Sequence, residues 1–152
     1  MSEPCPGCGL ELPPVGTPTH PYIGASPSCW ALYGELLARD YSDWDPEAHR
    51  LAVDTYAVQH PGGDDRRARQ SVACHLTALH LVLERGFRDA QVKEVVRSMV
   101  AAATELPRLE PPVSNGTVTV RDVLAGTPVR AWAEDVWAAW SAHHDRARAW
   151  AS

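Results

Sequence analysis

Helical hydrophobic periodicity is the feature that most constrains how this chain can fold. Apolar residues recur at helical spacing in four stretches, the first beginning at residue 26 and the others covering about residues 45–59, 65–85 and 89–104. This spacing puts apolar side chains on one face of an α-helix, whereas a half-buried strand would show strict alternation. No convincing pair of strand segments is evident, so we expect helices to dominate.

Local start and stop signals bound these helices. Ser26-Pro27 and Asp45-Pro46 each place an N-cap residue before a proline at the first helical position, where proline is well tolerated. The second helix should end near Gln59, because His60 precedes a proline and glycines follow it. Gly86 is a suitable C-terminal cap for the third helix.

The C-terminal third should hold a loop and two further helices. Residues 106–116 contain three prolines and an Asn-Gly pair, which is typical of a loop. Thr119 and Asp122 resemble a capping box for a short helix that ends at Gly126. Periodicity then predicts one last helix over about residues 129–150.

These patterns predict an all-α fold, a compact bundle of four to five helices with an irregular N-terminal zinc-knuckle arm. A chain of 152 residues suits a single domain, residues 1–152. Its expected parts are a metal-binding arm at 1–25, core helices at 26–104, a loop and short helix at 105–128, and a C-terminal Trp-rich helix at 129–152. The tryptophans of that last helix point in different directions, which suits either a helix buried on several sides or a homodimer interface.

Charge and hydropathy argue against two classes of partner. The chain carries 14 Lys and Arg against 19 Asp and Glu, a formal net charge of -5, whereas nucleic-acid binders usually present a basic stripe. No apolar run approaches the roughly 18 residues that a membrane helix needs. The first twenty residues lack a basic start and an apolar core, so no signal peptide is expected. We therefore expect a soluble cytoplasmic protein with reduced thiols, binding neither nucleic acid nor membrane.

The stretch CPGCG at residues 5–9 predicts a zinc site. Zinc in structural sites takes four ligands, typically thiolate and imidazole, and a C-x-x-C turn aims two sulfurs at one point. Pro6 and Gly9 suit such a turn, because proline sets one dihedral angle and glycine allows a positive one. A thioredoxin-type redox pair would open a helix, but LELPPVG follows Cys8. Plain buried thiols and a disulfide are the remaining alternatives.

Helix geometry selects the other two ligands. Cys29 lies at the third position of its helix, where the helix dipole favours a thiolate. If the first two helices form an antiparallel hairpin, the end of the second, with His60, returns to the level of Cys29. His49 lies 11 residues earlier, roughly 16 Å away along the helix, so one ion cannot bind both histidines. The leading set is Cys5, Cys8, Cys29 and His60, and the alternative set is Cys5, Cys8, His49 and His75.

A second group of residues suits acid/base catalysis. His49 and Tyr56 share a stripe of the second helix, and His75 should face them from the third. Imidazoles titrate near neutral pH and a phenol can donate a hydrogen bond, so His49, Tyr56 and His75 are the candidate catalytic residues. Each histidine could equally be a core residue bonded to a neighbour. Asp54 points about 140° away from the stripe and is expected to pair with Arg50.

The segments CPGCG, SPSCW, HRLAVDTYAVQHPGG and QSVACHL resemble a family of uncharacterised bacterial proteins, a domain of unknown function. The resemblance spans about residues 5–85 and is most specific over HRLAVDTYAVQHPG. It brings no activity with it. The positions that it places within motifs are Cys5, Cys8, Cys29, His49, Asp54, Tyr56, Gln59, His60 and His75.

Two functions follow from these residues. The first is a small zinc-binding helical protein whose metal ties the N-terminal arm to a helical hairpin and which acts as a binding or accessory module. The second is a small metal-dependent or histidine-based acid/base enzyme acting on a small molecule.

Overall fold

The computed structural model describes residues 2–42, 45–103 and 105–152, so residue 104, the expected end of the core helices, lies outside the described residues. The fold is all-α, as predicted, with a minor strand pair in the N-terminal arm. The elements are β1 (Glu3–Pro4), β2 (Glu11–Leu12), α1 (Pro27–Ser42), α2 (Pro46–Gln59), α3 (Arg66–Leu83), α4 (Asp89–Ala102), α5 (Val120–Leu124), α6 (Val129–Ala139), a 3-10 turn η1 (Ser141–His143) and α7 (His144–Trp150).

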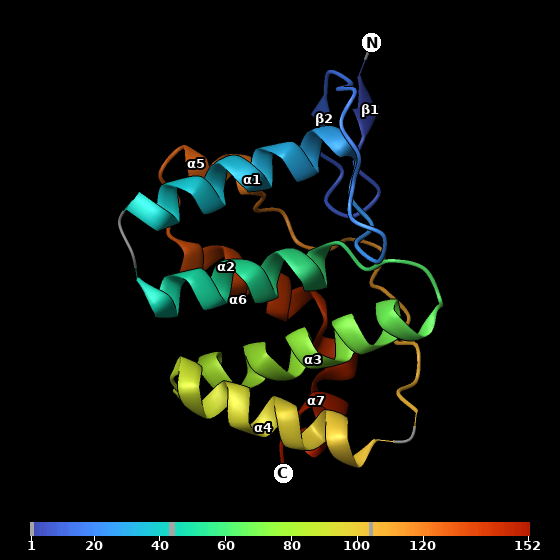
Figure 1. Ribbon diagram of the computed structural model, residues 1–152, viewed down its shortest axis with the longest axis vertical. Coiled ribbons are helices and arrows are strands. Elements are labelled where there is room, and N and C mark those ends of the chain that lie inside the picture. The colour runs from blue at the N-terminus through green and yellow to red at the C-terminus, as the bar shows by residue number, and fades with distance from the viewer. Residues whose placement is uncertain (1, 43–44, 104) are drawn as a thin grey trace.

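The helices form two layers. In Figure 1, α1, α2, α3 and α4 follow one another down the molecule with alternating direction, so each is antiparallel to the next. The other layer covers them from behind, since α5 packs on α1, α6 packs on α2 and α7 packs on α3. The antiparallel hairpin of α1 and α2 brings the N-terminal end of α1 back to the C-terminal end of α2.

The predicted helix starts are confirmed by their capping hydrogen bonds. The Cys29 backbone N–H donates to Ser26 Oγ at 3.1 Å, and the Glu47 N–H donates to the carboxylate of Asp45 at 3.1 Å. The Thr119 N–H donates to Asp122 at 2.8 Å, which closes the expected capping box of α5. These bonds satisfy backbone donors that a helix start leaves without a helical partner.

The C-terminal segment differs from the single helix that periodicity predicts. It divides into α6 and α7, with η1 between them. His144 Nε2 donates to the carbonyl oxygen of Trp137 at 2.8 Å, and this is the carbonyl that the next helical turn would use. Trp140, fully buried, is directed instead to Asn115, to which its indole N–H donates. The tryptophans of α6 are buried within this chain, which accounts for their spread around the helix.

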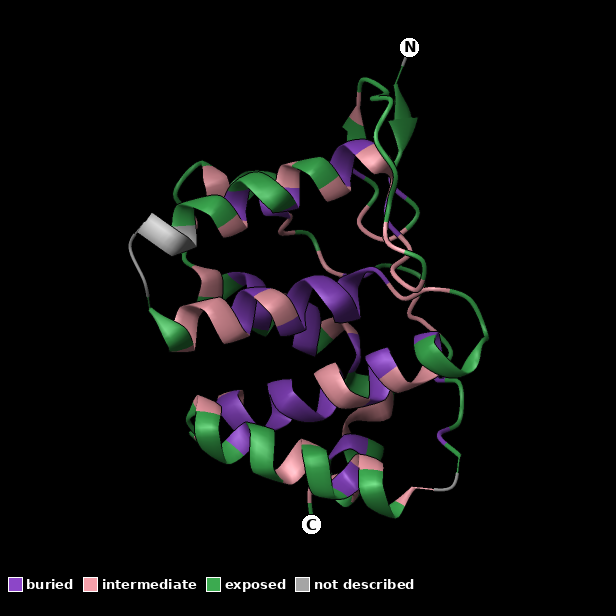
Figure 2. Ribbon diagram, viewed as in Figure 1, coloured by how far each residue is buried: buried purple, intermediate pink, exposed green. Residues whose placement is uncertain are grey.

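Helix α2 is the centre of the molecule. Every residue from 54 to 60 is buried, although four of the side chains are polar (Figure 2). Burying polar groups is costly unless each finds a hydrogen-bond partner. Gln59 meets this condition by donating to the carbonyls of Asn115 and Val118 and by accepting the indole N–H of Trp132 at 3.1 Å. Asp54 and His60 meet it in two different ways, described below, whereas Thr55 Oγ1 has no hydrogen-bond partner among the described residues.

The N-terminal arm contains a strand pair that the sequence analysis did not anticipate. Strands β1 and β2 are antiparallel, with Glu3 opposite Leu12 and Pro4 opposite Glu11. The arm then returns to the C-terminal end of α2, where Ile23 bridges to Pro61 and the Gly24 N–H donates to the His60 carbonyl at 2.8 Å. Two-residue strands pair too few groups to be stable alone, so the arm depends on its anchors to the helices.

None of the helices in the described part of the chain is long and apolar enough to cross a membrane.

Candidate metal centre

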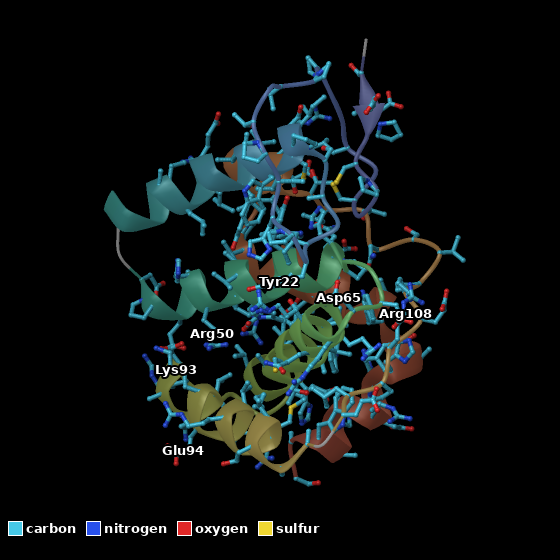
Figure 3. All side chains as sticks on the ribbon, turned by 45° about the vertical axis from the view of Figure 1, so that its right-hand side comes forward. Tyr22, Arg50, Asp65, Lys93, Glu94 and Arg108 are labelled. Carbon is cyan, nitrogen blue, oxygen red and sulfur yellow. The ribbon has the colours of Figure 1, made fainter. Side chains whose placement is uncertain are left out.

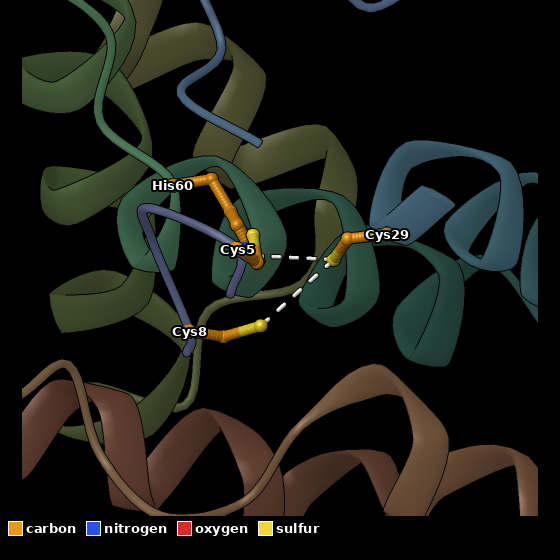
Figure 4. A group of neighbouring side chains, drawn as sticks. All are labelled: Cys5, Cys8, Cys29 and His60. Carbon is orange, nitrogen blue, oxygen red and sulfur yellow. Dashed lines mark hydrogen bonds between the residues drawn. The ribbon is translucent and has the colours of Figure 1, made fainter. Parts of the chain in front are cut away.

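Four side chains converge where the arm, the start of α1 and the end of α2 meet (Figure 4). The ligand atoms of Cys5, Cys8, Cys29 and His60 all lie within 4.8 Å of one another, and this group can hold a metal ion. Cys5, Cys29 and His60 are buried, and Cys8 is partly buried. These are the leading ligands predicted from the sequence.

The turn that carries Cys5 and Cys8 is fixed by the backbone. The Cys5 N–H donates to the Leu10 carbonyl at 3.0 Å, and the Gly9 N–H donates to the Cys5 carbonyl at 2.8 Å. Gly9 has a φ of 77°, which a residue with a side chain rarely adopts. At Gly7, an added Cβ would lie 2.4 Å from His60 Cδ2, so only glycine lets the imidazole pack against the turn.

Hydrogen-bond donors surround the sulfur atoms. The Tyr56 hydroxyl donates to Cys29 Sγ at 3.2 Å, and the Ser26 backbone N–H donates to Cys5 Sγ at 3.5 Å. Burial and the Cys29 sulfur hold the pKa of Tyr56 well above its ordinary value, so the phenol keeps the proton that it donates. Such outer donors stabilise thiolate charge and orient the ligands of metal sites.

His60 has the tautomer that a metal ligand needs. Its Nδ1 lies 2.8 Å from the carbonyl oxygen of Tyr56. A carbonyl only accepts, so Nδ1 carries the proton and Nε2 presents a lone pair. Nε2 lies 3.5 Å from Cys29 Sγ, on the side of the thiols. The ring also stacks on Tyr56 with centroids 3.9 Å apart, which limits its rotation.

Two of the distances between ligand atoms match those of a tetrahedral zinc ion and are too long for a disulfide. With Zn–S bonds of about 2.3 Å and Zn–N bonds of about 2.0–2.1 Å, a tetrahedron separates two sulfurs by about 3.8 Å and sulfur from nitrogen by about 3.5 Å. Cys8 Sγ and Cys29 Sγ are 3.8 Å apart, and Cys29 Sγ and His60 Nε2 are 3.5 Å apart. All four cysteines are free thiols in this structure.

Three thiols this close cannot all ionise without a cation. Hydrogen bonds from Cys29 and Cys8 hold the pKa of Cys5 far below its ordinary value, which favours one thiolate there. Interaction with Cys5 and Cys8, together with burial, raises the pKa of Cys29 well above its usual range. For Cys8, Cys29 lowers the pKa, but Cys5 and burial outweigh it and raise the pKa to about 11. A bound divalent cation would remove this restriction by stabilising every thiolate.

Of the candidate catalytic residues, His49 and His75 lie outside this cluster, whereas Tyr56 contacts it. The three residues line more than one cavity. His49 and His75 line a cavity of about 310 Å³ between α2, α3 and α4. Tyr56 and His75 line a neighbouring cavity of about 170 Å³, but the Tyr56 hydroxyl bonds to Cys29. The structure thus brings His75 near both of the others and directs the Tyr56 hydroxyl toward the metal centre.

Asp54 has a larger role than sequence reasoning assigned to it. Its expected partner Arg50 does bind it, with Nη1 at 2.9 Å and 3.2 Å from the two carboxylate oxygens. The other contact was not predicted, because His75 Nδ1 lies 2.7 Å from Asp54 Oδ1. Helix α3 contacts the side of α2 that carries Asp54 as well as the stripe of His49. The presence of both residues in the motif runs was the available signal.

The charged groups near Asp54 form ion pairs with one another, Arg50 with Asp54 and Asp89, and Lys93 with Asp89. Burial lowers the pKa of Arg50, but Asp54 and Asp89 outweigh it and hold the pKa above its ordinary value. Burial raises the pKa of Asp89, but Arg50 and Lys93 outweigh it and hold that pKa below its ordinary value. Arg50 therefore remains charged and links the carboxylates of α2 and α4, with Asp89 closest to its Nε.

Comparison with known proteins identifies a family but no activity. A sequence model described as a family of unknown function, DUF5946, matches residues 3–141, which is most of the chain. No curated protein and no solved structure matches significantly. The match extends beyond the motifs of residues 5–85 and includes α6. The chain therefore belongs to DUF5946, a family of unknown function.

Proposed function

We propose that the protein binds one structural zinc ion that ties the N-terminal arm to the hairpin of α1 and α2, and that it acts as a binding or accessory module. The observation that carries this proposal is the convergence of three thiols and one correctly protonated imidazole within 4.8 Å in a buried position. Thiolate and imidazole donors in a tetrahedral arrangement favour zinc over the harder cations Mg²⁺ and Ca²⁺, which take oxygen ligands.

The number of donors supports a structural rather than a catalytic ion. Structural zinc sites take four protein ligands, whereas catalytic sites keep one position for water or substrate. Here Cys5, Cys8, Cys29 and His60 supply all four donors, and three of them are buried. Zinc would contribute folding energy at this position, and it would keep thiols deprotonated in a reducing compartment such as the cytoplasm.

The arm is the part of the molecule that such an ion would stabilise. Of the described residues in 2–25, only Cys5, Leu10 and Ala25 are buried, so little apolar burial fixes this segment. Ordering a residue costs about 1–2 kcal/mol of backbone entropy, which sparse burial does not offset. Metal binding at Cys5 and Cys8 would supply what the hydrophobic contacts lack.

The enzyme hypothesis keeps one specific observation in its favour, the Asp54–His75 contact of 2.7 Å. A buried carboxylate that fixes the tautomer of an accessible imidazole is an arrangement used for general acid/base chemistry. It supports the histidine-based version of that hypothesis, because it is independent of the metal centre.

Metal analysis of the purified protein tests the proposal. We expect about one zinc per wild-type chain, and little zinc in Cys5→Ser and His60→Ala, because each variant removes one of four ligands. His75→Ala and Cys74→Ser should keep their zinc, since neither residue belongs to the cluster. Cys74→Ser is the matched control for thiol loss. Full zinc content in His60→Ala would refute the ligand set, and wild-type protein that takes up no zinc would refute the proposal.

A further inference from the structure

Three cavities meet at His75. One is lined by Arg67, Gln70 and Cys74 and has a volume of about 300 Å³. The second, of about 310 Å³, has charged walls, and the third, of about 170 Å³, has aromatic walls. His75 lines all three, and we call them the His75 cavities. Figure 3 labels Arg50 and Lys93 on the charged side and Tyr22 on the aromatic side.

The His75 imidazole is held in one orientation with one nitrogen bonded. Nδ1 lies 2.7 Å from the Asp54 carboxylate, which only accepts, so Nδ1 carries the proton in the neutral ring. Asp54 is itself fixed, since its side chain is 1% exposed and both oxygens accept from Arg50. The imidazole is 29% exposed, so its remaining nitrogen, Nε2, is an acceptor for a ligand that enters the cavities.

The smallest of the His75 cavities has walls suited to a flat ring. Side chains from the arm, α1 and α2 supply five aromatic rings to its lining, His20, Tyr22, Trp30, Tyr33 and Tyr56. Neighbouring rings in this wall are tilted, stacked or edge-to-face, with Trp30 and Tyr33 centroids 5.5 Å apart. Aromatic rings favour offset-stacked and edge-to-face partners. A cavity of about 150 Å³ is known to hold a benzene ring, so about 170 Å³ is sufficient for one six-membered ring.

A buried hydroxyl marks the same place. Ser71 lies one helical turn before His75 on α3 and lines two of the His75 cavities. Its residue is 9% exposed, and its Oγ has no hydrogen-bond partner among the described residues. An unpaired buried hydroxyl costs about 1–3 kcal/mol, and a polar ligand would supply the missing partner.

We propose that the His75 cavities bind a small molecule consisting of one flat ring that carries a hydroxyl or N–H donor. The ring lies among the aromatic side chains of the smallest cavity, and the donor group bonds to His75 Nε2. Ser71 Oγ bonds to a second polar atom of the ligand. Because a buried carboxylate supports the imidazole, His75 can also accept the donor's proton.

The proposed site is separate from the metal ligands but shares a wall with them. Tyr56 places its ring in the smallest cavity and its hydroxyl on Cys29 Sγ. Tyr22 and Ile23, which line the same cavity, belong to the arm that reaches the end of α2 through the Ile23–Pro61 bridge. An intact metal centre would hold this wall in place, whereas loss of His75 would leave the metal unaffected.

Phenol is the probe for this proposal, and benzene is the comparison that lacks the donor. Phenol titrations of the 152-residue, zinc-loaded protein, followed by NMR, should show saturable chemical-shift changes confined to residues that line the cavities. Benzene should bind at least 10-fold more weakly than phenol. In His75→Gln, phenol should lose at least 10-fold in affinity and become similar to benzene. His143→Gln, at a histidine outside the cavities, is the matched control and should bind phenol as wild type does.

A second variant and a second measurement keep the result decisive. Ser71→Leu fills the smallest cavity and should abolish binding of both molecules, even if His75→Gln is poorly folded. Equal phenol affinity in wild type and in folded His75→Gln would overturn the proposal, as would shifts that do not saturate. Zinc content is measured on the same samples. If zinc-loaded protein does not bind phenol, the ligand site is refuted and the zinc site is not. If zinc-free protein binds phenol, the ligand site exists independently of the metal.

Discussion

Two sites along α2 present similar residue types in opposite settings. At the C-terminal end, His60 joins three thiols in a buried cluster whose donors all face one another. In the middle of α2, Asp54 holds His75 beside cavities that remain open to solvent. Both histidines have Nδ1 bonded to a protein oxygen, a carbonyl for His60 and a carboxylate for His75. What surrounds Nε2 therefore decides what each imidazole can do.

This difference separates a site for a permanently bound ion from a site for an exchangeable ligand. His60 Nε2 faces other ligand atoms at tetrahedral spacing, so it suits an ion that stays in place. His75 lines cavities of ligand size, so its second ring nitrogen suits a molecule that exchanges. Damage to the metal centre should therefore change folding and metal content, and damage to the His75 cavities should change binding.

Metal removal should have the largest effect. Chelation of zinc should lower the free energy of unfolding by about 4 kcal/mol or more, because loss of a structural metal is among the largest single perturbations. For a domain of this size that corresponds to a fall in Tm of about 10 °C. Thermal denaturation with and without chelator measures it. The same chelator should not shift the Tm of Cys5→Ser. An unchanged wild-type Tm would remove the distinction between the metal centre and the His75 cavities.

Asp54→Asn should have the second largest effect. We expect the free energy of unfolding, measured by urea denaturation, to fall by about 3 kcal/mol. The substitution keeps the shape of the side chain but removes the charge that Arg50 and His75 share in the protein interior. Zinc content should stay at the wild-type level. Asp145→Asn, at a fully exposed partner of Arg148, is the control and should leave stability unchanged. Loss of zinc from folded Asp54→Asn would show that the metal centre and the His75 cavities form one site.

Gly7→Ala should have the smallest of these effects, and its effect should be confined to the metal centre. The added methyl would lie 2.4 Å from His60 Cδ2 and 2.7 Å from the Gln59 carbonyl oxygen, so the imidazole or the turn must shift. We expect a decrease in zinc affinity of about 10-fold, measured by competition with a chromogenic chelator. Gly16→Ala is the matched control, because no atom lies within 4 Å of a methyl there. Equal affinity in the two variants would show that the turn does not position His60.

Much of the metal centre could be predicted because its determinants are local. The spacing of Cys5 and Cys8, the place of Cys29 at the third position of a capped helix, and the proline after His60 are readable within a few residues. Helix rise then converts sequence separation into distance, which excluded His49 from a site with His60. The one tertiary assumption was an antiparallel hairpin, which short connections favour.

The His75 cavities and the C-terminal break could not be predicted in the same way. Asp54 and His75 are joined only because the packing of α3 on α2 covers the side of α2 that carries Asp54. The continuous helix expected over residues 129–150 divides near Trp137 and Trp140. There the His144 side chain bonds to the Trp137 carbonyl, and the Trp140 indole N–H donates to the Asn115 side chain. Both depend on residues far apart in sequence or on side-chain contacts that periodicity does not record.

The sequence by itself determined the helical class, most helix boundaries and the four residues that can hold a metal, since capping, periodicity and turn chemistry act over a few neighbouring residues. Only the tertiary structure decided which side of α2 faces α3, and therefore that a buried carboxylate orients His75 beside open cavities. The physical reason is that packing chooses among helix faces by the fit of whole surfaces, whereas local signals specify only where each helix begins and ends.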